Sequence, residues 1–102
     1  MSVRIQSSSE VITAFLEGEL DHHQAKDIRE QIDRHIEEYG ARLLILDFAD
    51  VSFMDSSGIG LVMGRYRQMK LADGEVRVQG ASPQIARVMK LAGLERLHVL
   101  QE

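Results

Sequence analysis

The spacing of hydrophobic and polar residues changes several times along the chain, and each change predicts a new element. Apolar residues alternate with polar ones over residues 3–5, and residues 11–16 are rich in strand-forming side chains. A serine-rich turn separates the two segments, so we predict a hairpin whose second strand is interrupted by Gly18. Residues 43–46 form a continuous apolar run, which is typical of a central strand buried on both faces.

Three segments show the three-to-four-residue spacing of amphipathic helices. Asp21, with Gln24 three residues later, predicts the start of the first helix, and Gly40 predicts its left-handed end. A second helix is expected from Gly58 onward, and a third opens at Ser82-Pro83 with the serine as its cap. The predicted inner faces contain Ala25, Ile28, Ile32 and Ile36; Ile59, Val62, Met63, Tyr66 and Met69; and Ile85, Val88, Met89 and Ala92.

Two further strands complete the predicted architecture. Short strands are expected at residues 76–78 and at residues 97–100, which gives the order ββαβαβαβ. Repeated strand–helix–strand units favour parallel pairing, so we predict an α/β fold with a mixed, mostly parallel sheet and an antiparallel N-terminal hairpin. Residues 1–102 are expected to form a single domain. The pattern alone leaves open whether the helices cover one face of the sheet or both.

Charge and composition narrow the range of partners. The chain has 16 acidic and 12 basic residues and a formal net charge of −4. Because nucleic acid and anionic membranes bind clustered Lys and Arg, we expect neither as a main partner. The absence of cysteine excludes disulfides, thiolate metal sites and cysteine nucleophiles, and it fits a reducing cytoplasm. No signal peptide and no membrane-spanning run is expected.

The stretch FMDSSGIGLVMGRY, residues 53–66, holds the candidate chemistry. It lacks the Gly-x-Ser-x-Gly elbow of serine hydrolases, and no histidine spacing supplies a base, so we do not expect an enzyme. Gly58 and Gly60 stand where a strand meets a helix, but the remainder of a phosphate-binding motif is absent, so we expect them to allow close packing. His22 and His23 point about 100° apart on a helix and are not expected to share a metal ion.

Three consecutive capping-type residues, Asp55, Ser56 and Ser57, precede the second predicted helix. One of them is expected to cap that helix. A loop between a strand and a helix is also accessible to the active site of another protein. A phosphate there adds about −1.5 to −2 charge at neutral pH, which helix N-terminal amides tolerate but a partner fitted to a neutral serine does not. A serine at this position is therefore a candidate binding switch.

Two motifs make the chain resemble a known family: GELDHH, residues 18–23, and the stretch of residues 53–66 with its Asp-Ser-Ser-Gly core. Both are similar to the anti-sigma-factor antagonists of the STAS domain family, and among these to the antagonists of the sporulation sigma-F pathway. The resemblance covers nearly the whole chain. It implies a STAS fold, in which the helices lie largely on one side of a mixed sheet.

The resemblance also implies a mechanism of partner switching. The unphosphorylated antagonist binds an anti-sigma factor, itself a serine kinase, and frees the sigma factor; the kinase then phosphorylates the antagonist, and a PP2C-type phosphatase restores it. Ser56 maps onto the phosphate acceptor, Ser57 onto its structural neighbour or cap, and Asp21 onto an acid that contacts the kinase. ATP and Mg²⁺ belong to the kinase, so no cofactor is expected in the chain. The partner surface is expected to contain Asp21, His22, His23, Asp55, Ser56, Ser57, Gly58 and Ile59.

Two alternatives stand beside the phosphorylation switch. One is a small nucleotide-binding regulatory domain that uses the junction at Gly58 and Gly60. The other is a STAS module that scaffolds a signalling complex without being modified. The chain is expected to be cytoplasmic, and the switch protein is expected to be a monomer when free.

Overall fold

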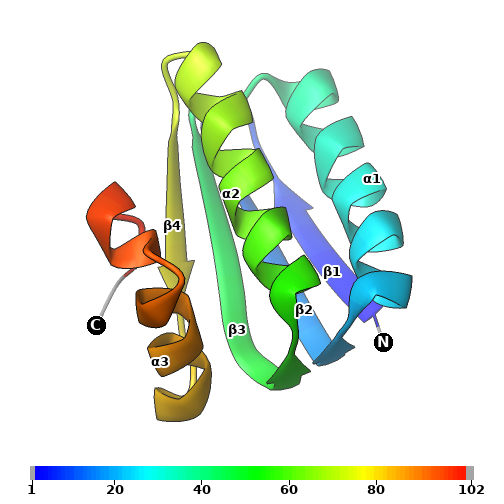
Figure 1. Cartoon of the computed structure of the whole chain (residues 1–102). Coiled ribbons are helices and arrows are strands. Elements are labelled where there is room, and N and C mark those ends of the chain that lie inside the picture. The colour runs from blue at the N-terminus through cyan, green and yellow to red at the C-terminus, as the bar shows by residue number, and fades with distance from the viewer. Residues whose placement is uncertain (1, 101–102) are drawn as a thin grey trace.

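Four strands form one sheet in the computed structural model, which describes residues 2–100 (Figure 1). The strands are β1 (Ser2–Ser7), β2 (Val11–Leu20), β3 (Leu43–Met54) and β4 (Glu75–Gln79), and they lie in the order β1-β2-β3-β4. β1 runs antiparallel to β2, whereas β3 is parallel to both β2 and β4. The predicted mixed sheet with an N-terminal hairpin is confirmed.

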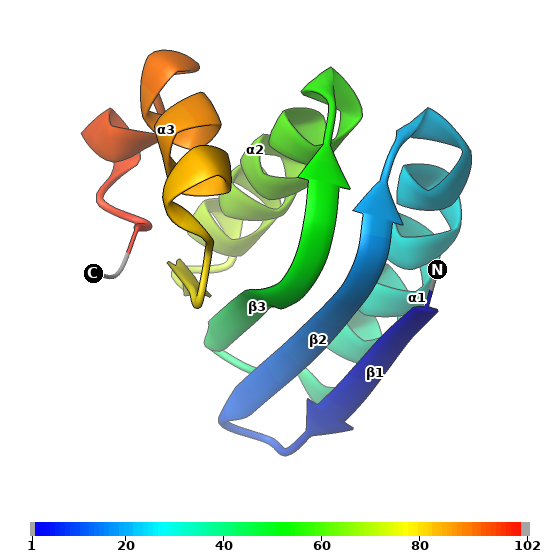
Figure 2. The same cartoon turned by 90° about the horizontal axis from the view of Figure 1, so that it is seen from below.

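Each of the strands β2, β3 and β4 is followed by a helix. These helices are α1 (His22–Tyr39), α2 (Ser56–Leu71) and α3 (Pro83–Leu91). Figures 1 and 2 show α1 and α2 over the same face of the sheet and α3 beside β4, as the family resemblance implies. Gly40 ends α1 in the left-handed conformation at φ +61°, and the Ser82 hydroxyl caps α3 by accepting a hydrogen bond from a first-turn amide at 3.2 Å. Both of these predicted helix boundaries are confirmed.

Ser8 closes the turn between β1 and β2. Its hydroxyl accepts from the amides of Glu10 and Val11 at 3.3 and 3.1 Å, and its own amide donates to the Val11 carbonyl at 2.9 Å. Ser9 remains exposed in this turn. The turn lies at one end of the sheet, and α1 and α2 begin at the opposite end (Figure 1).

Side chains on the helix-covered face of the sheet form the core. In β3, Leu44, Leu46 and Phe48 are buried, whereas Leu43 and Ile45 on the other face are half-buried. The prediction that this strand is buried on both faces is wrong, because α1 and α2 cover the same face. The core also contains Ile12, Ala14, Leu16, Ile28, Ile32, Ile36, Val62, Met69, Val76, Val78, Ile85 and Met89.

β3 carries extra residues as it approaches the end where the helices begin. Its register against β2 shifts twice between Phe15 and Glu19, and each time β3 contributes one residue more than β2. Gly18 adopts φ +93°, a conformation that residues with a side chain rarely reach. β2 therefore continues through Gly18 to Leu20 instead of being interrupted there. Beyond the second shift, Phe53 of β3 is 49% exposed.

The chain after α3 forms no further strand within the part that the structure describes. Leu94–Leu97 is a short 3-10 helix, and only Leu100 pairs with the sheet, through an isolated bridge to Val78. The last strand predicted at residues 97–100 is therefore wrong. Gly93 and His98 have φ of +91° and +58°, so the backbone turns on both sides of the 3-10 helix and does not run extended.

The buried face of α2 differs from the predicted apolar stripe. Its buried residues are Gly58, Leu61, Val62, Arg65 and Met69. The predicted members Ile59, Met63 and Tyr66 are half-buried. The buried face therefore differs from the predicted one, because Gly58 and Arg65 belong to it. A search for apolar residues at helical spacing does not select a glycine or an arginine. In α1 the predicted isoleucines are buried, and in α3 Ile85 and Met89 are buried while Val88 is 38% exposed.

Candidate functional site

β2 and β3 end side by side, and each is followed by an aspartate that starts a helix. Leu20 of β2 pairs with Met54 of β3, and the amide of Asp55 donates to the Leu20 carbonyl at 3.3 Å. The residues after the two strands therefore share one end of the sheet. We call the surface formed here by residues 21–23 and 55–59 the serine rim. It brings together the eight residues predicted to contact a partner, but Gly58 is buried on the inner face of α2 and only the other seven reach the surface.

Both aspartates cap the helices that follow them. The Asp21 carboxylate accepts from the amides of His23 and Gln24 at 3.0 and 3.1 Å, and the Asp55 carboxylate accepts from the Ser57 amide at 2.8 Å. Each bond satisfies an amide that has no partner within its helix. Among the three capping-type residues, Asp55 is therefore the cap, and Ser57 supplies the backbone amide that it caps.

The two serines of the rim differ in exposure. Ser56, the first residue of α2, is exposed, whereas Ser57 is half-buried and faces α1. In the same stretch of chain, Phe53 is 49% exposed and Ile59 is half-buried, so apolar side chains also reach the surface. Ser56 therefore presents its hydroxyl to another protein more openly than Ser57 does.

His22 and His23 open α1, and both are exposed. Their ring centroids lie 4.0 Å apart, with the ring planes tilted by 35°. Within residues 2–100, no group of three or more His, Cys, Asp or Glu side chains is placed to hold a metal ion. The histidine pair adds exposed ring surface to the rim directly after Asp21.

Gly58 and Gly60 have different roles, although both are predicted to allow close packing. A Cβ at Gly58 would lie 2.6 Å from Met54 Sδ and 3.1 Å from Leu20 Cδ2, so this glycine lets α2 approach the ends of the strands. A Cβ at Gly60 would meet nothing within 4 Å. The prediction of close packing is therefore confirmed for Gly58 and wrong for Gly60.

We expect Gly58→Ala to lower the free energy of unfolding by about 1–2 kcal/mol, because Met54 and Leu20 must move to admit the methyl group. Gly60→Ala is the matched control. It is expected to raise the free energy of unfolding by about 0.5–1 kcal/mol, because alanine favours a helix over glycine and the position is open. Urea denaturation of both variants measures this difference, and equal effects would contradict the packing role of Gly58.

A hollow of about 380 Å³ lies between the N-terminal parts of α1 and α2, beside Ser57. We call it the cationic groove, because Lys26 and Arg29 line its α1 side. Its complete lining is His22, Ala25, Lys26, Arg29, Ser57, Gly60 and Leu61. The sequence prediction missed both cations. Their positions four and seven residues after His22 place all three on one side of a helix, which was the available signal.

Arg65 of α2 is buried at the interface with α1. Its Nε lies 3.1 Å from Asp33 Oδ1 and donates to Gln68 Oε1 at 3.2 Å, while Arg65 Nη1 and Asp33 Oδ1 have no hydrogen-bond partner. Burial lowers the pKa of Arg65; the Asp33 carboxylate opposes this shift and Arg29 adds to it. Charge attraction, more than directed hydrogen bonding, therefore ties α2 to α1 at this point.

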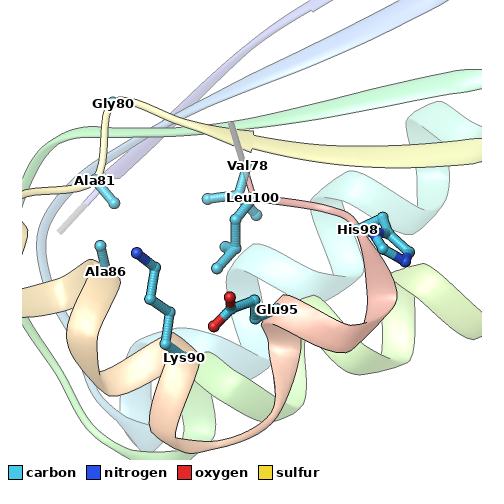
Figure 3. A pocket seen from close by; sticks show the side chains of 8 residues that line it. All are labelled: Val78, Gly80, Ala81, Ala86, Lys90, Glu95, His98 and Leu100. Atoms are coloured by element: carbon cyan, nitrogen blue, oxygen red, sulfur yellow. The ribbon is translucent and has the colours of Figure 1, made fainter. Parts of the chain in front are cut away.

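A separate hollow of about 430 Å³ lies between β4, α3 and the C-terminal segment (Figure 3). Val78 and Leu100 contribute apolar walls, and the side chains of Lys90 and Glu95 enter it from α3 and from the 3-10 helix (Figure 3). No residue of the serine rim lines this hollow. It is therefore not part of the candidate site.

Comparison with known families matches residues 2–101 to the STAS domain. The chain belongs to the STAS domain family. A protein of Paenibacillus polymyxa named anti-sigma F factor antagonist is 31% identical to this STAS chain over 95% of the chain and 83% of the relative. A protein of the same name from Lysinibacillus sphaericus is 38% identical over 83% of the chain and 73% of the relative.

Solved structures of SpoIIAA share the fold of this STAS chain. The unphosphorylated form of that anti-sigma factor antagonist superposes with a TM-score of 0.87 at 33% identity, covering 98% of this chain and 86% of SpoIIAA. The phosphorylated form of the Bacillus protein gives a TM-score of 0.79 at 33% identity, covering 98% and 89%. These relatives are regulatory binding proteins rather than enzymes, and the STAS chain is assigned to the same class. None of the helices in residues 2–100 combines the length and apolar character needed to cross a membrane.

Proposed function

We propose that the chain is an anti-sigma factor antagonist controlled by phosphorylation of Ser56. In the unphosphorylated form it binds an anti-sigma factor and so frees a sigma factor, and the phosphorylated form no longer binds. The exposed hydroxyl of Ser56, at the first position of α2 on the rim of a STAS fold, carries this proposal. It is supported by relatives named anti-sigma F factor antagonists and by SpoIIAA, which has been solved in unphosphorylated and phosphorylated forms.

A phosphate on Ser56 is compatible with the local structure. It would stand at a helix N-terminus, where the helix dipole favours negative charge. Asp55 already caps this helix through the Ser57 amide, so the modification requires no change of cap. The fold is then preserved, and the added charge acts on the surface that meets the partner.

In this proposal the partner is an anti-sigma factor that is itself a serine kinase, and a PP2C-type phosphatase reverses the modification. ATP and Mg²⁺ are bound by the kinase, so the antagonist needs no cofactor. Both capping bonds of Asp21 go to Oδ1, which leaves Oδ2 to face a basic group of the kinase. The antagonist acts in the cytoplasm and is a monomer when free.

Phosphorylation by the cognate anti-sigma kinase with ATP and Mg²⁺ tests the acceptor. The wild-type chain and Ser57→Ala are each expected to gain the mass of one phosphoryl group, and Ser56→Ala is expected to gain none, because Ser56 offers the exposed hydroxyl. Intact-mass spectrometry measures the outcome. Full phosphorylation of Ser56→Ala would show that another residue is the acceptor.

A further inference from the structure

The side of α1 that faces α2 carries two cations near its N-terminus, Lys26 and Arg29, and one carboxylate farther along, Asp33. His22, Lys26 and Arg29 line the groove on this side, and Asp33 follows four residues later. Asp33 is paired with Arg65 of α2. Lys26 and Arg29 are exposed, and neither forms an ion pair within residues 2–100. Two cations without an ion-pair partner therefore line one groove of a chain whose net charge is −4.

The neighbouring Asp27 and Arg65 do not pair with these two cations. The Asp27 carboxylate accepts a hydrogen bond from the Gln31 amide group at 3.1 Å, along an exposed part of α1. Arg29 is close enough to Arg65 to disfavour the charged form of that guanidinium. Lys26 and Arg29 thus line the groove between α1 and α2 with no carboxylate of residues 2–100 within ion-pairing distance. The α2 side of the groove, at Gly60, is open, because a Cβ there would meet nothing within 4 Å.

We propose that the cationic groove receives an acidic side chain, Asp or Glu, of the anti-sigma factor. This inference rests on the proposed function. The groove is continuous with the serine rim through His22 and Ser57, which belong to both. Its volume of about 380 Å³ admits a carboxylate side chain, and Lys26 and Arg29 can donate charge-assisted hydrogen bonds to it.

The cationic groove gives phosphorylation of Ser56 an electrostatic effect on the partner in addition to the steric effect of the phosphate. Ser56 directly precedes Ser57, which lines the groove. A phosphate on Ser56 places about −1.5 to −2 charge beside the groove, where it repels a carboxylate of the partner and attracts the two cations itself. The modified chain thereby loses the charge complementarity on which the unmodified chain relies.

Titration of the unphosphorylated full chain with its cognate anti-sigma factor tests this assignment. Lys26→Gln/Arg29→Gln is expected to weaken binding about tenfold and Lys26→Glu/Arg29→Glu about 100-fold, because charge pairs at the interface are lost and then reversed. The matched control is Arg34→Glu/Arg67→Glu, which makes the same charge change at exposed positions outside the groove. It is expected to change affinity less than about threefold. Thermal unfolding confirms that each variant is folded.

The outcomes separate this inference from the proposed function. If the wild type binds and Ser56→Asp does not, but the groove variants lose no more affinity than the control pair, the groove inference is wrong and the switch stands. If the wild type does not bind the anti-sigma factor, both are wrong. Equilibrium dialysis of the free chain with ATP supplies a further check. ATP binding that disappears in Lys26→Gln/Arg29→Gln, with affinity for the anti-sigma factor unchanged, would make the groove a nucleotide site and overturn the inference.

Discussion

Ser56→Asp is expected to weaken binding to the anti-sigma factor by at least about 100-fold, which corresponds to about 2.7 kcal/mol. The substitution adds a negative charge at the exposed first position of α2. A partner surface fitted to a neutral serine supplies no cation of its own for this carboxylate, so binding must desolvate the charge without compensation from the partner. Isothermal titration calorimetry with the wild type and the variant measures the change.

The fold itself is expected to tolerate this substitution, because an acidic residue in the first turn of a helix is favourable. Ser9→Asp is the matched control, since it adds the same charge in the exposed hairpin turn at the opposite end of the sheet. It is expected to keep the affinity within about twofold of the wild type, because salt screens exposed charges beyond about 10 Å. Equal binding by Ser56→Asp and the wild type would remove the electrostatic basis of the switch.

Asp33→Asn is expected to lower the free energy of unfolding by about 2–3 kcal/mol. The change leaves Arg65, which is only 8% exposed, without its counter-charge. Breaking a fully buried pair costs about 3–5 kcal/mol, and the value here is smaller because the Asp33 side chain is 29% exposed. Urea denaturation measures the loss as a lower midpoint at unchanged slope.

Two further variants test whether the loss of stability comes from the charge pair between Asp33 and Arg65. Asp50→Asn makes the same change of charge at an exposed position of β3 and is expected to alter the free energy of unfolding by less than about 0.5 kcal/mol. Asp33→Leu/Arg65→Met removes both charges and is expected to recover most of the loss, because neither partner is then left uncompensated. A double variant as unstable as Asp33→Asn would show that the charge pair is not the cause.

Local signals predicted much of the fold and of the rim. A helix cap is decided by a few neighbouring residues, so Asp21, Gly40 and Ser82 are recognisable as helix boundaries from the sequence. The serine pair is recognisable in the same way, because Asp55 and the glycine after Ser57 mark a strand-to-helix junction. Parallel pairing of β2 with β3 then brings the two caps to one end of the sheet.

Features that depend on contacts distant in the sequence were not predicted. The inner face of α2 includes Arg65, whose burial depends on Asp33 in another helix. The continuous apolar run at the start of β3 is typical of a strand that is buried on both faces, but α1 and α2 cover only one face of the sheet. The cationic groove exists only once α1 and α2 lie side by side, so Lys26 and Arg29 read alone as ordinary surface residues. Residues 97–100 have strand-like composition, but the left-handed His98 turns the backbone away.

The hairpin turn between β1 and β2 offers a point of attachment. The chain contains no cysteine, and Ser9 is exposed in this turn, at the far end of the sheet from the helix N-termini (Figure 1). Ser9→Cys would therefore introduce the only thiol of the molecule. A fluorophore or a sensor surface coupled to that thiol leaves Ser56 facing solution, so partner capture and release can be followed on protein held in a single orientation.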